Sequence, residues 1–321
     1  MIGFVHQALR YRSEDQFRDT VARFVRDGLD AGDTLLVVVS VRNIALLGEA
    51  LGSRFRDLES HDARDWYDYP SRTLGRYHSY CRRQGAGRRV RVVGEPVWAG
   101  RTDFETREWM RYESLVNVAF AGSGHWILCP YDIRMLPESV VCSAARTHPE
   151  LLDEPRAAVD YADPADFSAE CDERGLARLP GGADGIRFAG GRTAAVRRAL
   201  KAYARRLGLS EQRAYDLVAA VHETMVNALR YGGGQGVVRL HSDRDHVICE
   251  ISDFGAHTPV AGPPFPGHLP PEPGAPGGHG MWLVRQLSDL VDDDLDPGGS
   301  VVRLYFRRPR RDQPAAGSVN S

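Results

Sequence analysis

The chain has 321 residues, of which 42% are hydrophobic and 26% are charged, close to the averages of globular proteins. These values exclude a disordered or collagen-like chain and leave room for two domains. The 41 basic and 43 acidic residues give a formal charge of -2, so no strong overall field favours nucleic acid or a membrane surface.

The cysteines and the N-terminal segment favour a reduced, cytoplasmic protein. No Cys-x-x-Cys pair and no cysteine–histidine pair stands at the spacing of a zinc site. The five cysteines are Cys81, Cys129, Cys142, Cys171 and Cys249. The first residues lack a basic stretch followed by an apolar one. The longest apolar run, residues 35–41, is interrupted by Ser40 and is far shorter than the roughly 20 residues that span a bilayer. We expect no export signal and no membrane segment.

Helical and strand patterns alternate through residues 1–152, the first predicted domain. Helices are predicted at residues 13–29, 44–51, 74–83, 104–120 and 137–145. Buried strands are predicted at residues 34–39, 89–93 and 125–129. Because helices separate continuous apolar strands, we expect an α/β domain with a mostly parallel sheet covered by helices.

Residues 153–190 are predicted to form a linker with local turns, because proline, glycine and acidic residues break the periodicity there. A second domain is predicted at residues 191–307, and a disordered tail at residues 308–321. The elements predicted in the second domain are helices at 193–207, 210–231 and 281–290, and strands at 237–240, 247–252 and 301–306. Ser210 is the expected N-cap of the second helix, and the glycines at 232–234 end it.

The first motif of chemical interest is HETMVNALRYG, residues 222–232, on this second helix. Glu223 and Asn227 are four residues apart, so they lie on one helix face, one turn from each other. They border the apolar stripe of the helix, where a ligand could lie between the helix and a loop. The pair is equally compatible with an ordinary exposed glutamate and asparagine.

Two further motifs follow along the chain. Asp253 and Gly255 come at the end of an apolar strand, where a carboxylate could accept the exocyclic amine of adenine and a glycine lets a base approach the backbone. The sequence GGHG, residues 277–280, runs into an amphipathic helix whose free N–H groups and dipole favour a phosphate. Each motif has a simpler interpretation, since most Asp-x-Gly sequences are turns and most glycines before helices are caps.

The segment between these two motifs is long and rich in proline and glycine. Residues 259–280 carry one formal charge, that of Glu272. A loop of this length inside a compact domain is usually functional or disordered, and a mobile lid over a ligand is the functional form.

Taken in order, the E-x-x-x-N helix, the D-x-G strand end, the loop, the G-x-G helix and the last strand resemble the ATPase family shared by gyrase, heat-shock chaperones, histidine kinases and mismatch-repair proteins. The resemblance covers about residues 193–307 and is closest to the bacterial anti-sigma-factor serine kinases. It implies a Bergerat-type α/β sandwich, open and with a mixed sheet, that holds ATP between sheet, helices and lid.

The resemblance also implies a role for each motif residue. Asn227 would ligate Mg²⁺ through its side-chain oxygen and bridge the metal to the phosphates. Glu223 would orient or deprotonate the attacking hydroxyl, as the catalytic residue. Asp253 would bind the adenine amine, and Gly255 would make room for the base. Gly278 and Gly280 would line the phosphates. These roles agree with phosphoryl transfer, which needs mainly positioning and charge neutralisation.

The sequence departs from the kinase pattern in one respect. Residues 256–280 contain no arginine or lysine to neutralise the γ-phosphate and only three histidines, His257, His268 and His279. Nucleotide binding is therefore better supported than turnover. A histidine kinase is less favoured, because residues before 190 show no long helical hairpin to carry a phosphoacceptor. No GxxxxGK[ST] loop is present.

Segments of the first domain, among them FVHQALRYRSEDQF, GEPVW, CPYD and RTHPELL, resemble the bacterial MEDS sensory domain over about residues 3–152. The resemblance implies that the domain senses a small ligand, and it is compatible with a RecA-like core that lacks the phosphate loop. Our candidate pocket residues are His6, Tyr11, Glu95, Trp98, Cys129 and Asp132. A buried Trp98 or Cys129 is more often plain core, and His6 and Tyr11 are more often satisfied hydrogen-bonding groups.

Together the resemblances predict a signal-responsive anti-sigma regulator of transcription in a stress response. It would bind ATP and Mg²⁺ and phosphorylate a serine or threonine of an anti-anti-sigma partner. The alternative is a non-catalytic, ATP-dependent switch that sequesters a sigma factor or its antagonist. Formation of a homodimer is left as an alternative to a monomer. We expect neither direct nucleic-acid binding nor a membrane partner. The arginines near the C-terminus, Arg307, Arg308, Arg310 and Arg311, are interpreted as a solvated end.

Overall fold

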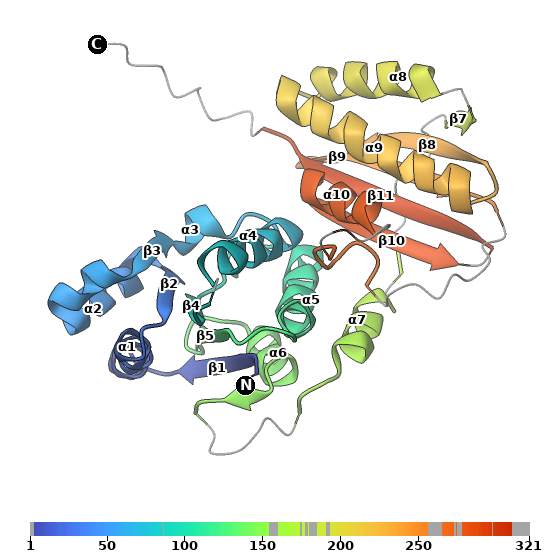
Figure 1. The fold of residues 1–321 in the computed structure, drawn as a ribbon. Coiled ribbons are helices and arrows are strands. Elements are labelled where there is room, and N and C mark those ends of the chain that lie inside the picture. Colours follow the sequence, from blue (N-terminus) through green and yellow to red (C-terminus); the bar gives the residue numbers. More distant parts are fainter. Residues whose placement is uncertain are drawn as a thin grey trace, which may run out of the picture. The chain divides into compact units, whose positions relative to one another are not determined.

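The computed structural model describes residues 3–85, 87–153, 160–173, 175–176, 179, 185–190, 193–255, 265–272, 274, 278–296 and 298–309. The chain divides into two compact units (Figure 1). Unit 1 comprises Met1–Arg174 with His268–Pro270, and unit 2 comprises Gly175–Gly267 with Pro271–Ser321. Residues 259–264, 273 and 275–277 of the predicted loop, and all of the predicted tail beyond Pro309, lie outside the described residues.

Unit 1 is built on a six-stranded sheet in the order β3-β2-β4-β5-β1-β6. Its strands are β1 (Val5–Tyr11), β2 (Thr34–Val39), β3 (Glu59–Asp62), β4 (Val90–Gly94), β5 (Trp126–Asp132) and β6 (Glu150–Leu151). Every strand pairing in the described part of this sheet is parallel. The predicted mostly parallel sheet is therefore confirmed, although β1, β3 and β6 were not among the predicted strands.

Helices cover both faces of this sheet, because its strands alternate two apolar faces. Helices α1 (Glu14–Asp30) and α2 (Val41–Leu51) pack on one face, against residues such as Leu9 and Val37. Helices α4 (Pro70–Gln84), α5 (Asp103–Ala119) and α6 (Glu138–Thr147) pack on the other, against residues such as Leu36 and Val92. Two short elements complete the order: η1 (Gly52–Asp57) lies between α2 and β3, and α3 (Ala63–Trp66) lies between β3 and α4.

Side-chain caps fix where several of these helices begin. The Ser13 hydroxyl accepts a hydrogen bond from the Gln16 amide at the start of α1, and Ser40 serves α2 in the same way. At α5 the cap is reciprocal, because Thr102 accepts from the Glu105 amide while Glu105 accepts from the Thr102 amide. The long helix α5 therefore has a defined start.

Unit 2 is a five-stranded sheet in the order β10-β11-β9-β8-β7. Its strands are β7 (Ile186–Ala189), β8 (Gln235–Ser242), β9 (His246–Asp253), β10 (Leu290–Asp296) and β11 (Gly299–Arg307). All described pairings are antiparallel, so the expectation of a mixed sheet was wrong. Each pair of neighbours in the order β10-β11-β9-β8-β7 runs in opposite directions, and no described strand makes a parallel pair there.

Three helices of unit 2 pack against one face of the sheet (Figure 1). They are α8 (Thr193–Arg206), α9 (Glu211–Tyr231) and α10 (His279–Leu287). Arg213, in the first turn of α9, donates to the Leu287 carbonyl at 2.8 Å and to Asp289 at 2.5 Å, and its guanidinium lies over the Phe306 ring. This side chain ties the start of α9 to the end of α10 and to β11.

Regular elements also occur where the sequence predicted only turns or a longer helix. Helix α7 (Pro164–Asp172), which begins at the N-cap Asp163, and strand β7 lie within the predicted linker. The predicted helix at 281–290 ends at Leu287, and β10 begins at Leu290. No helix in the described part of the chain combines the length and apolar character needed to cross a membrane.

Candidate functional site

Helix α9 presents Glu223 and Asn227 as the sequence predicted. Its apolar stripe, which includes Leu217, Val221 and Met225, is buried in the core of unit 2. Ser210 caps the helix by accepting a hydrogen bond from the Arg213 amide at 3.2 Å. Glu223 and Asn227 are half-buried at the border of the stripe, so a carboxylate and an amide stand next to each other beside the core.

Helix α10 brings Gly280 directly against this pair. A Cβ atom on Gly280 would lie 3.6 Å from Glu223 Oε2 and 3.6 Å from both terminal atoms of the Asn227 amide. Before it, Gly278 is the N-cap in the left-handed conformation, with φ 85° and no side-chain cap. Three predicted site residues from two separate helices therefore meet where α10 begins, and no side-chain cap occupies the N–H groups of its first turn.

Asp253, the last residue of β9, lies in a tight enclosure. Its carboxylate is part of a residue only 7% exposed, and Oδ1 accepts a hydrogen bond from the Ser300 amide at 3.2 Å. A Cβ atom on Gly232 would lie 2.3 Å from Asp253 Cγ. The carboxylate can occupy this place because Gly232 has no side chain.

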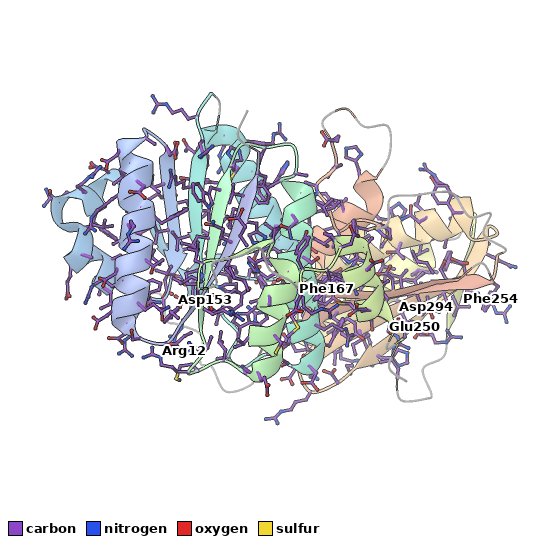
Figure 2. The ribbon with its side chains drawn as sticks, turned by 90° about the horizontal axis from the view of Figure 1, so that it is seen from below. Arg12, Asp153, Phe167, Glu250, Phe254 and Asp294 are labelled. Carbon is purple, nitrogen blue, oxygen red and sulfur yellow. The ribbon has the colours of Figure 1, made fainter. Side chains whose placement is uncertain are left out.

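Gly255 has a packing role that the sequence did not predict. A Cβ atom there would lie 2.2 Å from the Gly232 carbonyl carbon and 2.3 Å from the Gly233 nitrogen. The chain after β9 thus lies against the loop that ends α9, and the predicted use of Gly255 in making room for a base stays a prediction. Phe254, which lies between Asp253 and Gly255 just after the end of β9, is 63% exposed (Figure 2).

The donor set of this region fits ATP with Mg²⁺. The side-chain oxygen of Asn227 is of the kind that suits Mg²⁺. The start of α10, with its glycines, suits phosphate, because it offers N–H groups and the positive end of the helix dipole. Asp253 offers a buried acceptor for an amine. Gly277, the first residue of the third predicted motif, lies outside the described residues.

Unit 1 has a cavity of about 710 Å³ at the carboxyl ends of its parallel strands. This is the edge where open α/β sheets bind ligands. Four of the six candidate pocket residues line it: Tyr11, Glu95, Trp98 and Asp132. Tyr11 and Asp132 end β1 and β5, Glu95 follows β4, and Trp98 lies in the next loop.

Glu95 is the centre of the polar groups in this cavity. It accepts hydrogen bonds from the Ser40 amide at 2.8 Å, from Asn43 Nδ2 at 2.9 Å and from the Tyr11 hydroxyl at 3.2 Å. Burial, together with the neighbouring Glu95 carboxylate, raises the pKa of the Tyr11 phenol far above its ordinary value. Asp132 and Arg134 also line this cavity, and hydrogen bonds from Arg134 lower the pKa of Asp132. Tyr11 is therefore a neutral donor, and Asp132 an anion, at physiological pH.

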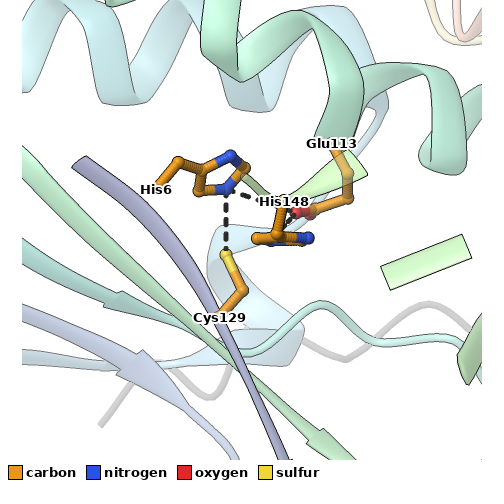
Figure 3. Close-up of side chains that lie close together, drawn as sticks. All are labelled: His6, Glu113, Cys129 and His148. Carbon is orange, nitrogen blue, oxygen red and sulfur yellow. Dashed lines mark hydrogen bonds and ion pairs between the residues drawn. The ribbon is translucent and has the colours of Figure 1, made fainter. Parts of the chain in front are cut away.

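His6 and Cys129, the other two candidates, do not line the cavity. They lie with Glu113 and His148 in a buried cluster between the sheet and helices α5 and α6 (Figure 3). Burial lowers the pKa of His6 to about 3 and that of His148 to about 4, and it raises the pKa of Glu113 to about 7. Glu113 and His148 were not among the candidates, because no short spacing joins residues 6, 113, 129 and 148 in the sequence.

Two family models match the chain. Residues 5–149 match the MEDS model, described as the methanogen/methylotroph, DcmR sensory domain. Residues 189–306 match the histidine kinase-like ATPase domain. No curated protein shows a significant match to the chain. The first match contains the cavity and the buried cluster, and the second contains the region around Glu223, Asn227 and Asp253.

Proposed function

Because the chain joins a MEDS domain to a histidine kinase-like ATPase domain, we propose that it is a signal-responsive regulator whose unit 2 binds ATP with Mg²⁺ and phosphorylates an anti-anti-sigma partner. The observation that carries the proposal is the meeting of Glu223, Asn227 and Gly280 at the start of α10. A carboxylate, an amide oxygen and the N–H groups of a helix start are together what a metal-bound phosphate requires.

Each residue of the site has one role in this proposal. Asn227 holds Mg²⁺ through its side-chain oxygen, and the N–H groups after Gly278 bind phosphate oxygens. Asp253 accepts a hydrogen bond from the adenine amino group. Glu223 accepts the proton of the serine or threonine hydroxyl of the partner. Bound ATP with its metal supplies the phosphoryl group, and the protein contributes position and charge.

The direct experiment is a transfer assay with the full chain, Mg²⁺, γ-labelled ATP and candidate anti-anti-sigma proteins. We expect acid-stable label on the partner. Glu223→Gln keeps the shape of the side chain but removes the base, so transfer falls roughly 100-fold or more while ATP affinity is retained. Glu211→Gln is the matched control, because Glu211 is an exposed glutamate in the first turn of the same helix. Undiminished transfer by Glu223→Gln would exclude Glu223 as the base.

A second function is favoured by the absence of arginine and lysine from residues 256–280. In this second function, bound ATP changes the affinity of unit 2 for a sigma factor or its antagonist. No phosphoryl group is transferred. The same assay separates the two forms. ATP binding without label on any partner, together with a partner affinity that depends on ATP, supports the switch.

We also propose that the cavity of unit 1 binds the signal. Its volume of about 710 Å³ lies in the range of small-molecule sites, and Tyr11, Glu95 and Asp132 provide polar groups that can orient a ligand. All five cysteines are unpaired, which supports a reducing, cytoplasmic location for the protein and its partner.

A further inference from the structure

Four potential metal ligands meet in the core of unit 1, away from the cavity. His6 comes from β1, Cys129 from the neighbouring β5, Glu113 from α5, and His148 directly follows α6. One ligand atom from each lies within 4.8 Å of all the others, and each residue is at most 4% exposed. We call these four residues the His6 cluster (Figure 3).

The separations match those around a four-coordinate metal. Cys129 Sγ lies 3.5 Å from His6 Nε2, His148 Nε2 lies 3.4 Å from a Glu113 oxygen, and His6 Nε2 lies 3.9 Å from the same oxygen. A tetrahedron with metal–ligand bonds of about 2.0–2.3 Å has edges of roughly 3.3–3.8 Å. Two of these three separations lie in that range, and the ligand atoms, which are at most 4.8 Å apart, would move closer together around a bound metal.

Hydrogen bonds outside the cluster orient both imidazoles. His6 Nδ1 donates to Asn117 Oδ1 at 3.0 Å, and Asn117 is held by donating Nδ2 to the Thr147 carbonyl at 2.7 Å. His148 Nδ1 donates to the Ala144 carbonyl at 2.9 Å. With Nδ1 carrying the proton in both rings, each Nε2 directs a lone pair into the cluster, as metal-binding histidines do.

Two acceptor atoms of the cluster lack a hydrogen-bond partner in the described part of the chain, whereas the Cys129 thiol lies within hydrogen-bonding distance of His6 Nε2. Glu113 Oε2 and His148 Nε2 are buried and have no hydrogen-bond partner within the described residues, although they face each other. Buried polar atoms are normally satisfied, and two acceptors in contact are unfavourable unless a proton or a cation lies between them. A metal ion satisfies all four side chains at once.

We propose that the His6 cluster is a binding site for a divalent first-row transition metal, Zn²⁺ by preference, with His6, Glu113, Cys129 and His148 as its ligands. Two imidazoles, one thiolate and one carboxylate suit Zn²⁺ and exclude Mg²⁺ and Ca²⁺, which take oxygen ligands. Binding releases the thiol proton of Cys129, and the thiolate forms the bond to the metal. Because all four positions are protein side chains, the site is structural.

The metal would brace the strands that form the cavity of unit 1. Strands β1 and β5 pair in parallel register, with Ala8 opposite Cys129 and Tyr11 opposite Asp132. The ligand His6 lies in the first half of β1, and the ligand Cys129 lies in the middle of β5. Both strands end at a cavity residue, which is Tyr11 in β1 and Asp132 in β5. A metal joining both strands to α5 and α6 therefore fixes the sheet beneath the cavity.

The test uses the untagged full chain. We expect purified protein to contain about one zinc per chain, and Co²⁺ added to metal-free protein to produce tetrahedral visible bands and a thiolate-to-cobalt absorption band. Zinc should raise the unfolding temperature of the metal-free protein. Magnesium should do none of these. Glu113→Gln and Cys129→Ser should weaken zinc binding at least tenfold.

Matched cysteine variants supply the controls. Cys81→Ser removes a thiol that is buried in the same core but lies outside the cluster, and Cys142→Ser removes the exposed one. Both should keep the thiolate–cobalt band that Cys129→Ser loses. Wild-type protein that takes up neither zinc nor cobalt stoichiometrically, or a thiolate band that survives Cys129→Ser, would overturn the proposal. The wild-type measurement decides even where a variant fails to fold.

Discussion

Gly232 shows how much one missing side chain contributes to the proposed nucleotide site. The sequence presents Gly232 as the end of a helix, and it does lie directly after α9. In the structure its free side also accommodates the Asp253 carboxylate, while the backbone of Gly232 and Gly233 lies against Gly255. The glycines after α9 and the Asp-x-Gly motif therefore pack directly against each other.

We predict that Gly232→Ala destabilises unit 2 and weakens ATP binding. The new methyl group would lie 2.3–2.7 Å from the three terminal atoms of Asp253, so the carboxylate must move. Overpacking of this kind typically costs about 1–3 kcal/mol. Thermal unfolding and calorimetry would measure both effects.

The control is Gly190→Ala, because nothing lies within 4 Å of the methyl group it would add. That change should leave the free energy of unfolding within about 0.5 kcal/mol of the wild type. Equal stability and equal ATP affinity for Gly232→Ala and wild type would show that Asp253 is not confined as described.

At the same scale, sequence reasoning found residues joined by short spacings and missed those joined only in space. Glu223 and Asn227 followed from their spacing on one helix turn, and Asp253 from its place at a strand end. Gly232 beside Asp253 and Glu113 beside His148 did not, because only the packing of separate elements brings them together. His6 and Cys129 were assigned to a ligand pocket, yet the structure places them in a separate core cluster.

Helix α9 is the element on which the proposed site depends most. It carries Glu223 and Asn227, and the loop at its end confines Asp253. Its start is fixed by the Ser210 cap and by the contacts of Arg213. The Ser210 cap sets the residue at which α9 begins. The Arg213 contacts hold this end of the helix against the end of α10 and against β11.

We predict that Ser210→Ala lowers the free energy of unfolding of unit 2 by about 1 kcal/mol, because the Arg213 amide loses its acceptor. Ser210→Asp should restore most of the loss, since aspartate is an equally good cap and its charge suits a helix start. Urea unfolding of the full chain, followed by hydrogen exchange of peptides from α9, would measure the change. No difference between Ser210→Ala and wild type would contradict this account of the helix start.

Long elements with a strong apolar period were predicted well, and short or acidic ones were not. The sequence predicts α1, α5 and α9 within a few residues of their observed bounds. It misses β10, whose sequence LVDDDLD has three aspartates in a row and forms a strand only because β11 pairs with it along its whole length. Helix α7 was missed because nine residues between prolines and glycines show little periodicity.

For the whole molecule, the important feature is that each unit has its own core. Two apolar clusters lie on the two faces of the sheet of unit 1, and a third fills unit 2. Alternation of helices and apolar strands predicts this division in the first half of the chain. The antiparallel arrangement of the second sheet could not be predicted, because strand direction depends on pairings that periodicity does not encode.

We predict that ATP with Mg²⁺ stabilises unit 2 specifically. A ligand at 100 times its dissociation constant adds about 2.7 kcal/mol to the stability of the state that binds it. Hydrogen exchange should therefore slow in peptides covering residues 211–255 and 278–290. Slower exchange confined to residues 5–149 would instead place the nucleotide in unit 1.

The most direct test of the central claim is calorimetry of the full chain with Mg²⁺ and ATP, comparing wild type with Asp253→Asn. We predict saturable binding of one nucleotide per chain and an affinity roughly 10- to 150-fold lower in the variant, because a hydrogen bond to a charged group is worth about 1.5–3 kcal/mol. The matched control is Glu250→Gln, a carboxylate on the same strand that accepts from Arg239 and Arg303, which should leave the affinity unchanged. No detectable binding of ATP by the folded wild-type chain at millimolar concentration would contradict the account.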